Sequence, residues 1–307
     1  MPKPDLSAII LTFNEDKHIE RCIKNIAPVS KEIVVIDSYS TDDTVLRARN
    51  LGARVLQHHF VNYAEQLNWA LDNVTVKSDW VMRLDADEYP SDQLTTALRE
   101  QLAYIPSEVC GLVINRQVKF LRKHIRYGGF GSKAVLRIWR HGIGRCESRW
   151  MDEHMILEHG KTKKIKGELI DENLNNISWW TQKHIQYASR EAIDLLNLRY
   201  GFLQREAGGQ LHVWQATVKR LLKERFYSRL PLGLRSILYY IFRMIVLGGI
   251  LDSPRGWVFH FLQGFWYRLL VDIKVMEVEK RMAHECISVI EAISSEFGID
   301  PLSLGGS

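Results

Sequence analysis

Short apolar runs alternate with segments of helical spacing through the first hundred residues, and this alternation constrains the fold more than any other feature. The apolar run at residues 6–12 is typical of a strand buried on both faces of a parallel sheet. Apolar side chains then recur at helical spacing in residues 15–26. Later strands are expected at 32–36, 54–57 and 80–84, with helices at 44–51 and 63–71. This order predicts an α/β fold with a mostly parallel central sheet flanked by helices.

Polar and acidic residues follow three of these strands. The first strand runs into Asn14, Glu15 and Asp16, which favours a core strand over a signal peptide. The second strand ends at Asp37, and the fourth ends at the sequence D-A-D-E, residues 85–88. Open α/β sheets bind ligands at the carboxyl edge of their strands, so we expect these loops to line one crevice. No G-x-G-x-x-G pattern follows the first strand, which argues against a dinucleotide-binding fold.

The carboxylates at the end of the fourth strand indicate metal chemistry. On extended backbone the side chains of Asp85 and Asp87 leave the same face, whereas Ala86 points away. Two carboxylates suit Mg²⁺ or Mn²⁺, which commonly takes phosphate oxygens as further ligands. The pattern therefore predicts chemistry on a nucleotide diphosphate, and a solvated turn is the alternative.

The rest of the chain changes character twice. Residues 111–156 have short strand patterns separated by glycine turns, and residues 178–225 have helical patterns. We therefore divide the chain into an α/β domain at 1–200 and a helical, basic and aromatic region at 201–307. The four cysteines are scattered without C-x-x-C pairs, so neither a zinc site nor a disulfide framework is indicated.

Several motifs in order resemble those of one enzyme family. They are T-F-N-E at 12–15, I-D-S-Y-S-T-D-D-T at 36–44, Q-L-N-W-A-L at 66–71, L-D-A-D-E at 84–88, W-M-D-E-H at 150–154 and K-H-I-Q-Y-A-S-R-E-A at 183–192. This set resembles the GT-A-fold, family 2 inverting glycosyltransferases, and is most similar to the bacterial branch that builds lipopolysaccharide, capsule and lipid-linked glycans.

The resemblance implies that residues 1–200 form a nucleotide-sugar-binding catalytic domain, with roles for residues around the donor. The nucleoside would be contacted by Thr12, Phe13, Asn14 and Glu15, and Asp37 would accept a hydrogen bond from the base or ribose. A turn cap is the alternative for Asp37, and Ser40 could serve both purposes. Gln66 and Asn68 would touch the donor or order the nucleotide loop, unless they lie on a solvated helix face. Asp85 and Ala86 would lie near the ribose and sugar, with Asp87 as the direct metal ligand and Asp85 beside it.

Inverting transfer also needs a base for the acceptor hydroxyl. The resemblance assigns it to Asp152 or Glu153, with a slight preference for Asp152; two surface acids are the alternative. His154 would bind diphosphate or metal, or is a structural histidine. His184 and Arg190 could face an acceptor phosphate, although a core histidine and a salt-bridged arginine are the favoured explanation.

Basic and aromatic residues gather in residues 219–268. Residues 219–243 contain seven Lys or Arg and one acid, Glu224, interleaved with apolar side chains. The most apolar window, 237–251, is interrupted by Arg243 and is too short to span a bilayer. This composition predicts helices lying on an anionic membrane. A packed helical hairpin or the interface of a homo-oligomer is the alternative, and no nucleic-acid-binding module is recognisable.

These observations predict a metal-dependent inverting glycosyltransferase. It would move a sugar from a nucleotide-diphosphate donor, a UDP-sugar, to a lipid-linked or lipopolysaccharide-core glycan, using Mg²⁺ or Mn²⁺. Its expected location is the cytoplasm, attached peripherally to the cytoplasmic face of the inner membrane. The alternatives are a catalytically inactive GT-A membrane scaffold and a sugar-phosphate nucleotidyltransferase. The latter usually opens with a glycine-rich basic loop, which the acidic sequence at 12–15 lacks.

Overall fold

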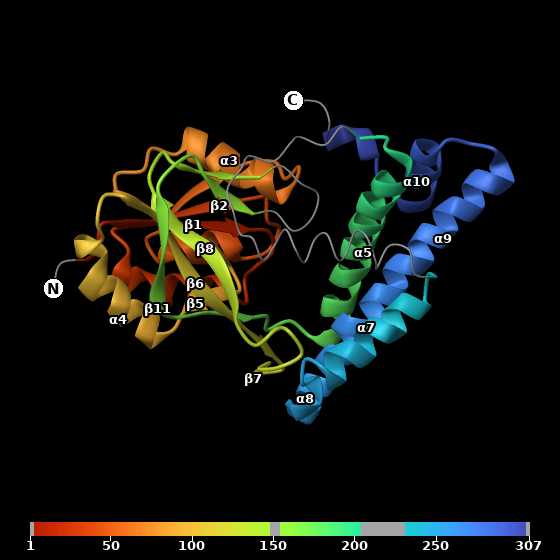
Figure 1. Ribbon diagram of the computed structural model, residues 1–307. Helices are drawn as coiled ribbons and strands as arrows, with labels where there is room; N and C mark the ends of the chain where they lie inside the picture. Colours follow the sequence, from red (N-terminus) through yellow and green to blue (C-terminus); the bar gives the residue numbers. More distant parts are fainter. Residues whose placement is uncertain (1–2, 148–153, 204–230, 305–307) are drawn as a thin grey trace. The chain divides into compact units, whose positions relative to one another are not determined.

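The computed structural model describes residues 3–147, 154–203 and 231–304. They form two compact units. The first contains residues 3–126, 130–147 and 154–175, and the second contains residues 127–129, 176–203 and 231–304. Figure 1 colours both along the sequence.

The predicted parallel strands are present and adjacent in the first unit. They are β1 (Leu6–Thr12), β2 (Glu32–Asp37), β3 (Arg54–Gln57) and β4 (Trp80–Asp85). Their spatial order is β3-β2-β1-β4, and all three pairings are parallel. Every residue of β1 is buried, which confirms the prediction of a strand covered on both faces.

The sheet continues beyond β4 with strands of mixed direction. β4 pairs antiparallel with β8 (Lys133–Arg140), which pairs antiparallel with β6 (Val109–Phe120). β6 is parallel to β11 (Lys161–Glu172), and β11 is antiparallel to β5 (Glu88–Pro90). The short β7 (Lys123–His124) pairs with β6, while β9 (Gly144–Cys146) and β10 (Met155–Leu157) form a separate ribbon.

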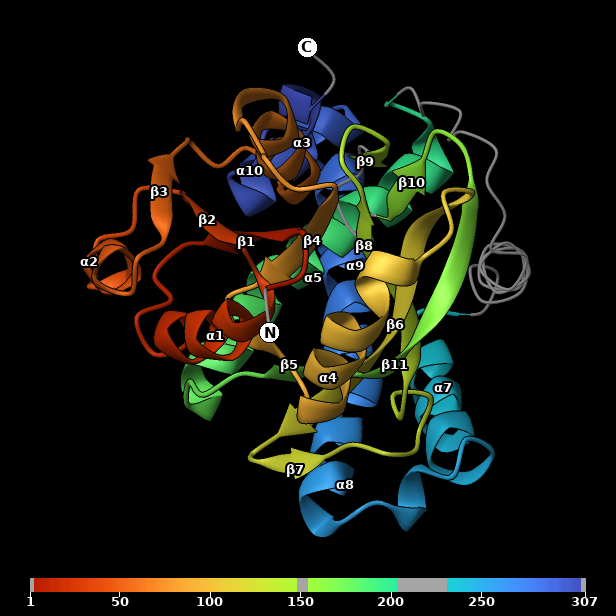
Figure 2. The same ribbon diagram turned by 90° about the vertical axis from the view of Figure 1, so that its left-hand side faces the viewer.

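Helices cover both faces of this sheet (Figure 2). Alternate residues of β1 belong to different core clusters: Ala8 and Ile10 lie in one, and Ile9 and Leu11 in the other. The first cluster includes buried residues of α1 (Ile19–Ile26), α2 (Thr44–Asn50) and α4 (Asp92–Gln101). The second includes residues of α3 (Tyr63–Asn73). Short 3₁₀ turns follow α1 at Ala27–Val29 and α4 at Leu102–Tyr104.

The second unit is helical in its described part. Its helices are α5 (Ile177–Tyr200), α7 (Leu234–Ile245), α8 (Pro254–Phe261), α9 (Tyr267–Glu285) and α10 (Val289–Phe297). A π-helical segment, Leu262–Trp266, joins α8 to α9, and 3₁₀ turns lie at Gly249–Leu251 (η4) and Pro301–Leu304. α5, α9 and α10 share one apolar core. The functional division at residue 200 stays a prediction, and α5 packs with the C-terminal helices.

A buried ion pair joins α7 to α9. The Arg235 guanidinium contacts Oδ1 of Asp272, and both side chains are at most 2% exposed. The other oxygen of Asp272 accepts from the hydroxyl of Ser236 at 3.0 Å and from the backbone N–H of Gly233 at 2.8 Å. Arg235 is therefore buried and cannot contact a membrane. The expectation that the basic residues of 219–268 face a membrane is wrong for this residue.

Replacing Asp272 with alanine should lower the free energy of unfolding by about 3–5 kcal/mol, because the buried Arg235 guanidinium would lose the carboxylate that contacts it. Urea denaturation of the full chain followed by circular dichroism measures the change. Glu285→Ala is the control: this carboxylate contacts Arg281 at an exposed position, so we expect a loss below about 1 kcal/mol. Equal losses in the two variants would contradict the assignment.

Candidate active site

The carboxyl ends of β1, β2 and β4 meet at one edge of the sheet. Thr12 pairs with Asp37 in the register of β1 and β2, and Leu11 pairs with Asp85 in that of β1 and β4. The Thr12 hydroxyl donates to Oδ1 of Asp37 at 3.1 Å. The expectation that the polar loops after these three strands share one edge is confirmed.

Asp37 organises the loop that follows β2. Its side chain is fully buried, and Oδ2 accepts from the backbone N–H of Ser40 at 2.9 Å and from the Gln57 amide at 3.1 Å. Oδ1 accepts from the Ser40 hydroxyl at 2.5 Å as well as from Thr12. Both carboxylate oxygens thus accept hydrogen bonds from the protein itself, as expected if Asp37 caps the turn. Its contact with a nucleoside stays a prediction.

The loop after β1 is held against the loop after β2. Asn14 adopts a left-handed backbone conformation, with φ 54°, and its N–H donates to the Ser40 hydroxyl at 2.8 Å. The backbone N–H of Glu15 donates to the Thr44 hydroxyl at 2.7 Å, and the Glu15 carboxylate contacts His18 Nδ1 at 2.5 Å. These bonds order the backbone and leave the Phe13 ring 56% exposed at the edge.

Gln66 and Asn68, both on α3, have ordering contacts. The Gln66 side chain is buried; its oxygen contacts His58 Nδ1 at 2.9 Å and its NH₂ donates to the Ser38 hydroxyl at 3.1 Å. The Asn68 amide exchanges two hydrogen bonds, each 2.9 Å, with the backbone of Cys146 in β9. Gln66 therefore orders the loop after β2, which is the second of its two expected roles. Asn68 anchors the ribbon of β9 and β10.

The backbone geometry expected at the acidic motif is wrong in one respect. Extended structure stops at Asp85, and Ala86 and Asp87 form a turn before β5. The argument that strand alternation aligns Asp85 with Asp87 therefore does not apply, because a turn has no two-residue repeat. Ala86 is buried, whereas Asp85 and Asp87 are each half-buried.

Asp85 lies among basic and hydroxyl groups. Oδ1 accepts from the Tyr63 hydroxyl, which in turn accepts from Arg83 Nε. Arg137 Nη2 lies 3.4 Å from Oδ2 of Asp85, and the Arg83 guanidinium stacks 3.9 Å from the centre of the Tyr63 ring. Burial disfavours the charged form, but Arg83 and Arg137 outweigh it and hold the pKa of Asp85 below its usual range.

Glu88 is the fully buried acid of the motif. Its carboxylate lies 2.5 Å from Arg137 Nη2 and 3.1 Å from Arg116 Nε, and it accepts from the backbone N–H of Asp85 at 3.1 Å. Burial raises the pKa of Glu88 to about 7; the carboxylates of Asp85 and Asp171 add to the rise, whereas the two arginines oppose it. Glu88 thus fixes the turn and the arginines around it.

Asp87 has the fewest described polar contacts of the three acids. Its Oδ2 accepts from the Asn173 amide at 3.3 Å. Its backbone carbonyl accepts from Arg21 at 3.2 Å and from the N–H of Glu172 at 3.1 Å, which fixes the turn. The described residues contain no cluster of three or more metal-ligating side chains. One or two carboxylates suffice where substrate phosphates complete the coordination of Mg²⁺, so Asp87, with Asp85 beside it, fits that donor set.

Two predicted catalytic acids, Asp152 and Glu153, lie outside the described residues. Where the chain is described again, the carbonyl of His154 accepts from the N–H of Glu147 at 2.9 Å, and Met155 pairs with Cys146. The ends of the segment that carries both acids are therefore joined by the β9–β10 ribbon, which Asn68 anchors. His154 itself is exposed.

His184 and Arg190 belong to α5 in the second unit. His184 stacks on Trp180 with ring centres 3.5 Å apart and contacts Tyr267 edge to face at 5.6 Å. Burial lowers the pKa of His184 to about 4, so the ring is neutral at neutral pH; it is half-buried against aromatic rings, which is nearer to the structural alternative than to a phosphate ligand. Arg190 is half-buried. Their contact with an acceptor stays a prediction.

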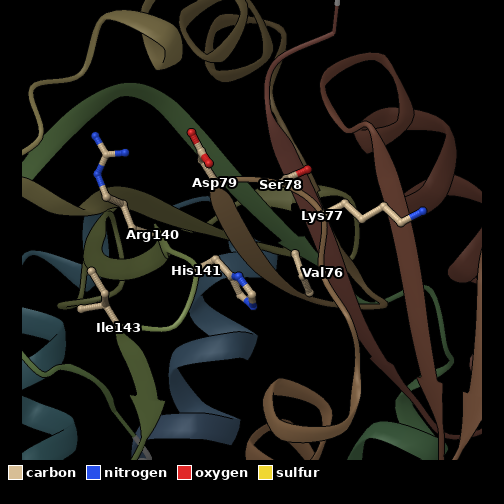
Figure 3. A pocket seen from close by; sticks show the side chains of 7 residues that line it. All are labelled: Val76, Lys77, Ser78, Asp79, Arg140, His141 and Ile143. Carbon is tan, nitrogen blue, oxygen red and sulfur yellow. The ribbon is translucent and has the colours of Figure 1, made fainter.

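A pocket lies at the other end of β4 from Asp85 (Figure 3). Its residues come from the segment before β4 and from the end of β8 and the turn after it, namely Val76, Lys77, Ser78, Asp79, Arg140, His141 and Ile143. It does not contain the predicted site residues.

Sequence reasoning missed Tyr63, Arg83 and Arg137. A signal was present for the arginines, since each interrupts an apolar strand, and charged residues are rarely buried without a partner. Nothing in the sequence distinguished Tyr63 from other aromatic residues at the start of a helix. Its partners, Arg83 and Asp85, lie in β4, 20 and 22 positions further along the chain, and they are recognised only when α3 packs on the sheet.

Comparison with known proteins identifies related sequences. Residues 7–163 match the family model described as Glycosyl transferase family 2. An uncharacterized glycosyltransferase of Rickettsia bellii (strain RML369-C) is 36% identical over 120 residues, which are 39% of each chain. The lipopolysaccharide core biosynthesis glycosyltransferase LpsC of Rhizobium meliloti (strain 1021) is 29% identical over 176 residues, covering 55% of this chain and 64% of LpsC. The chain thus spans less than two thirds of either relative.

Among solved structures, glucosyl-3-phosphoglycerate synthase from Mycobacterium tuberculosis, in complex with Mn²⁺, UDP and glucosyl-3-phosphoglycerate, is 25% identical. The match covers 38% of this chain and 44% of that enzyme, with a TM-score of 0.30. The family match, together with the parallel strands and their flanking helices, confirms the predicted GT-A fold.

Tyr63→Phe tests the hydroxyl that bridges Asp85 and Arg83. The ring stays over Arg83, but both charged groups lose a hydrogen-bond partner, so we expect a loss of about 1–3 kcal/mol in the free energy of unfolding. Tyr104→Phe is the matched control, because that side chain is 84% exposed and its hydroxyl should contribute less than about 0.5 kcal/mol. Equal melting temperatures for Tyr63→Phe and the parent chain would refute the bridge.

Proposed function

We propose that this chain, which belongs to glycosyl transferase family 2, transfers a sugar from a nucleotide-diphosphate donor to a cell-envelope glycan with inversion at the anomeric carbon. The observation that carries the proposal is the meeting of Thr12, Asp37 and Asp85 at one edge of the sheet, with half-buried Asp87 in the adjoining turn. Ligands of open α/β sheets bind at this edge.

The donor nucleoside would bind against the loops that follow β1 and β2. Phe13 and Tyr39 are 56% and 45% exposed there, and exposed aromatic rings stack well on a planar base. The backbone of both loops is fixed by Asn14, Ser40 and Asp37 before any donor arrives, which reduces the entropy lost on binding. We propose a UDP-sugar as the donor.

The diphosphate would lie near the turn at Ala86 and Asp87. A Mg²⁺ or Mn²⁺ ion held by Asp87, with Asp85 beside it, would neutralise the negative charge that develops on the leaving nucleotide. The chain's own contribution is positioning. Glu88 and the arginines fix the turn, and Asp85 stays ionised because Arg83 and Arg137 stabilise its charge.

The acceptor hydroxyl needs a base on the face opposite the leaving diphosphate. Asp152 or Glu153 would take the hydroxyl proton while the oxygen bonds to the anomeric carbon and the bond to the diphosphate breaks. We propose a lipid-linked or lipopolysaccharide-core glycan as acceptor. This is supported by the likeness to LpsC, named for lipopolysaccharide core biosynthesis.

We further propose that the protein works attached to the cytoplasmic face of the inner membrane, through residues within 219–268. In the part of the chain that the structure describes, none of the helices is long and apolar enough to cross a bilayer.

Asp87→Asn should reduce metal-stimulated hydrolysis of the donor by about 100-fold or more, because the substituted amide cannot supply a charged ligand. Release of nucleotide from a panel of UDP-sugars, with and without Mn²⁺, measures the effect. Asp79→Asn is the matched control, since this exposed aspartate precedes the opposite end of β4. Unchanged metal-dependent activity in Asp87→Asn would remove this residue as a metal ligand.

Asp152→Asn and Glu153→Gln, made separately, should identify the base. Loss of the base is expected to lower turnover by about 10²–10⁴-fold while nucleotide affinity stays almost unchanged. Glu158→Gln, at an exposed position just after β10, controls for loss of a nearby charge. If neither variant slows transfer, the base lies elsewhere in the chain.

A further inference from the structure

Helix α7 has a reversed distribution of polar and apolar side chains. Its buried residues are Arg235, Ser236 and Arg243. Its exposed residues are apolar, and each is at least 45% exposed: Leu234, Ile237, Leu238, Ile241, Phe242 and Ile245. A helix on the surface of a water-soluble domain normally has the opposite arrangement, so the outward face of α7 is suited to an apolar environment.

The apolar surface continues from α7 onto η4 and α8. Ile250 and Leu251 of η4 are 58% and 68% exposed, and Trp257, Val258 and Phe261 of α8 are 44–48% exposed. The three elements contact one another, and the ring centres of Tyr240 and Phe261 lie 6.1 Å apart. We call the exposed apolar side chains of residues 234–261 the apolar face.

A buried polar chain beneath the apolar face fixes its orientation. Arg243 Nε donates to Nδ1 of His260 at 3.0 Å, and Nε2 of His260 lies 2.8 Å from Asp252. All three side chains are at most 3% exposed. Arg243 and Asp252 cannot turn outward without breaking these hydrogen bonds to His260, so the apolar side chains must stay on the surface.

Glycines make room for this polar chain. A Cβ at Gly264 would lie 2.9 Å from Cδ of Arg243, and one at Gly256 would lie 2.5 Å from Cβ of Asp252. Both contacts are shorter than side chains tolerate. Glycine at these two positions therefore leaves the space that Arg243 and Asp252 occupy inside the helical unit.

The charge of this surface is compatible with an anionic bilayer. Every exposed residue between 234 and 261 is apolar except Arg255, and the single acid in that range, Asp252, is buried. No exposed carboxylate would therefore repel phosphate headgroups, and the one exposed ionised side chain is a cation.

We propose that the apolar face inserts into the boundary between the headgroups and acyl chains of a phospholipid bilayer. The helices would lie in the plane of the membrane, since those described are too short or too polar to span it. The inference rests on the proposed membrane-associated function and names the surface of the protein that contacts the bilayer. Attachment depends on buried apolar area, whereas Arg235 and Arg243 act inside the fold and not on headgroups.

A bilayer fits this face better than a second copy of the chain. Protein interfaces have a polar rim with hydrogen bonds around an apolar centre, whereas Arg255 is the single exposed polar side chain in this range. A bilayer requires no directional hydrogen bonds from the apolar face, and the apolar side chains of two helices and a turn can enter it together.

The experiment is co-sedimentation of the full chain with vesicles of phosphatidylethanolamine and phosphatidylglycerol. The double variant Ile245→Glu/Leu251→Glu changes two residues that are each 68% exposed. We expect at least about tenfold weaker binding to vesicles, because two charges replace inserted apolar groups. The matched control is Leu46→Glu/Tyr104→Glu, which changes two exposed residues of the first unit and should bind within about twofold of the parent chain.

Salt separates insertion from surface electrostatics. Binding of the parent chain should persist at about 0.5 M NaCl, where headgroup attraction is largely screened. Equal binding of the apolar-face variant and the parent, or loss of parent binding at high salt, would overturn the proposal. A different result would also overturn it: the parent chain dimerises in solution and does not bind vesicles, whereas the apolar-face variant is monomeric. That result would identify a second copy of the chain as the partner.

Donor hydrolysis, measured on the same proteins, distinguishes this inference from the proposed chemistry. The Ile245→Glu/Leu251→Glu variant should hydrolyse a soluble UDP-sugar at the parent's rate within about twofold, because its changes lie in the second unit. Vesicle binding without any hydrolysis would reject the proposed reaction and leave the membrane contact standing. Hydrolysis without apolar-face-dependent vesicle binding would reject the contact alone.

Discussion

The buried contact of Glu88 with Arg137 and Arg116 is the constraint on which the site depends. A carboxylate with no exposed surface needs compensating charge, and here the compensation comes from β8 and β6, the antiparallel part of the sheet. Glu88 also accepts from the N–H of Asp85. One side chain therefore connects the parallel strands, the turn that carries Asp87, and the arginines that keep Asp85 ionised.

Most polar residues at the carboxyl edge form hydrogen bonds that hold the neighbouring loops in place. Asp37 holds the loop after β2, Gln66 supports that loop from α3, and Asn68 anchors β9 at the start of the segment that leads to the predicted base. Polar side chains whose hydrogen bonds are satisfied internally define the positions of the exposed Phe13 ring and the half-buried Asp87 carboxylate. Such preorganisation is what transfer between two bound substrates requires.

The second unit also pairs its buried charges, but beneath an apolar surface. In the first unit, buried charges are paired under a site that would bind charged ligands. In the second unit, the buried charges of Arg243 and Asp252 are linked through the His260 ring beneath a surface that is almost wholly apolar. In both units the buried ionised groups have hydrogen-bond partners. The first unit then presents polar groups that suit a charged ligand, and the second presents apolar groups that suit a bilayer.

The sequence by itself determined the order of β1 to β4, their burial and the edge at which Thr12, Asp37 and Asp85 meet, because local periodicity and parallel pairing are encoded over short stretches. It also indicated the acidic motif and the high apolar content of residues 237–251. Only the tertiary structure decided that Ala86 and Asp87 form a turn, that Tyr63, Arg116 and Arg137 surround the acids, and that Arg235 and Arg243 point inward. Those outcomes depend on partners 17 to 52 residues away, on other strands and helices, and the free energy of pairing buried charge overrides the local pattern.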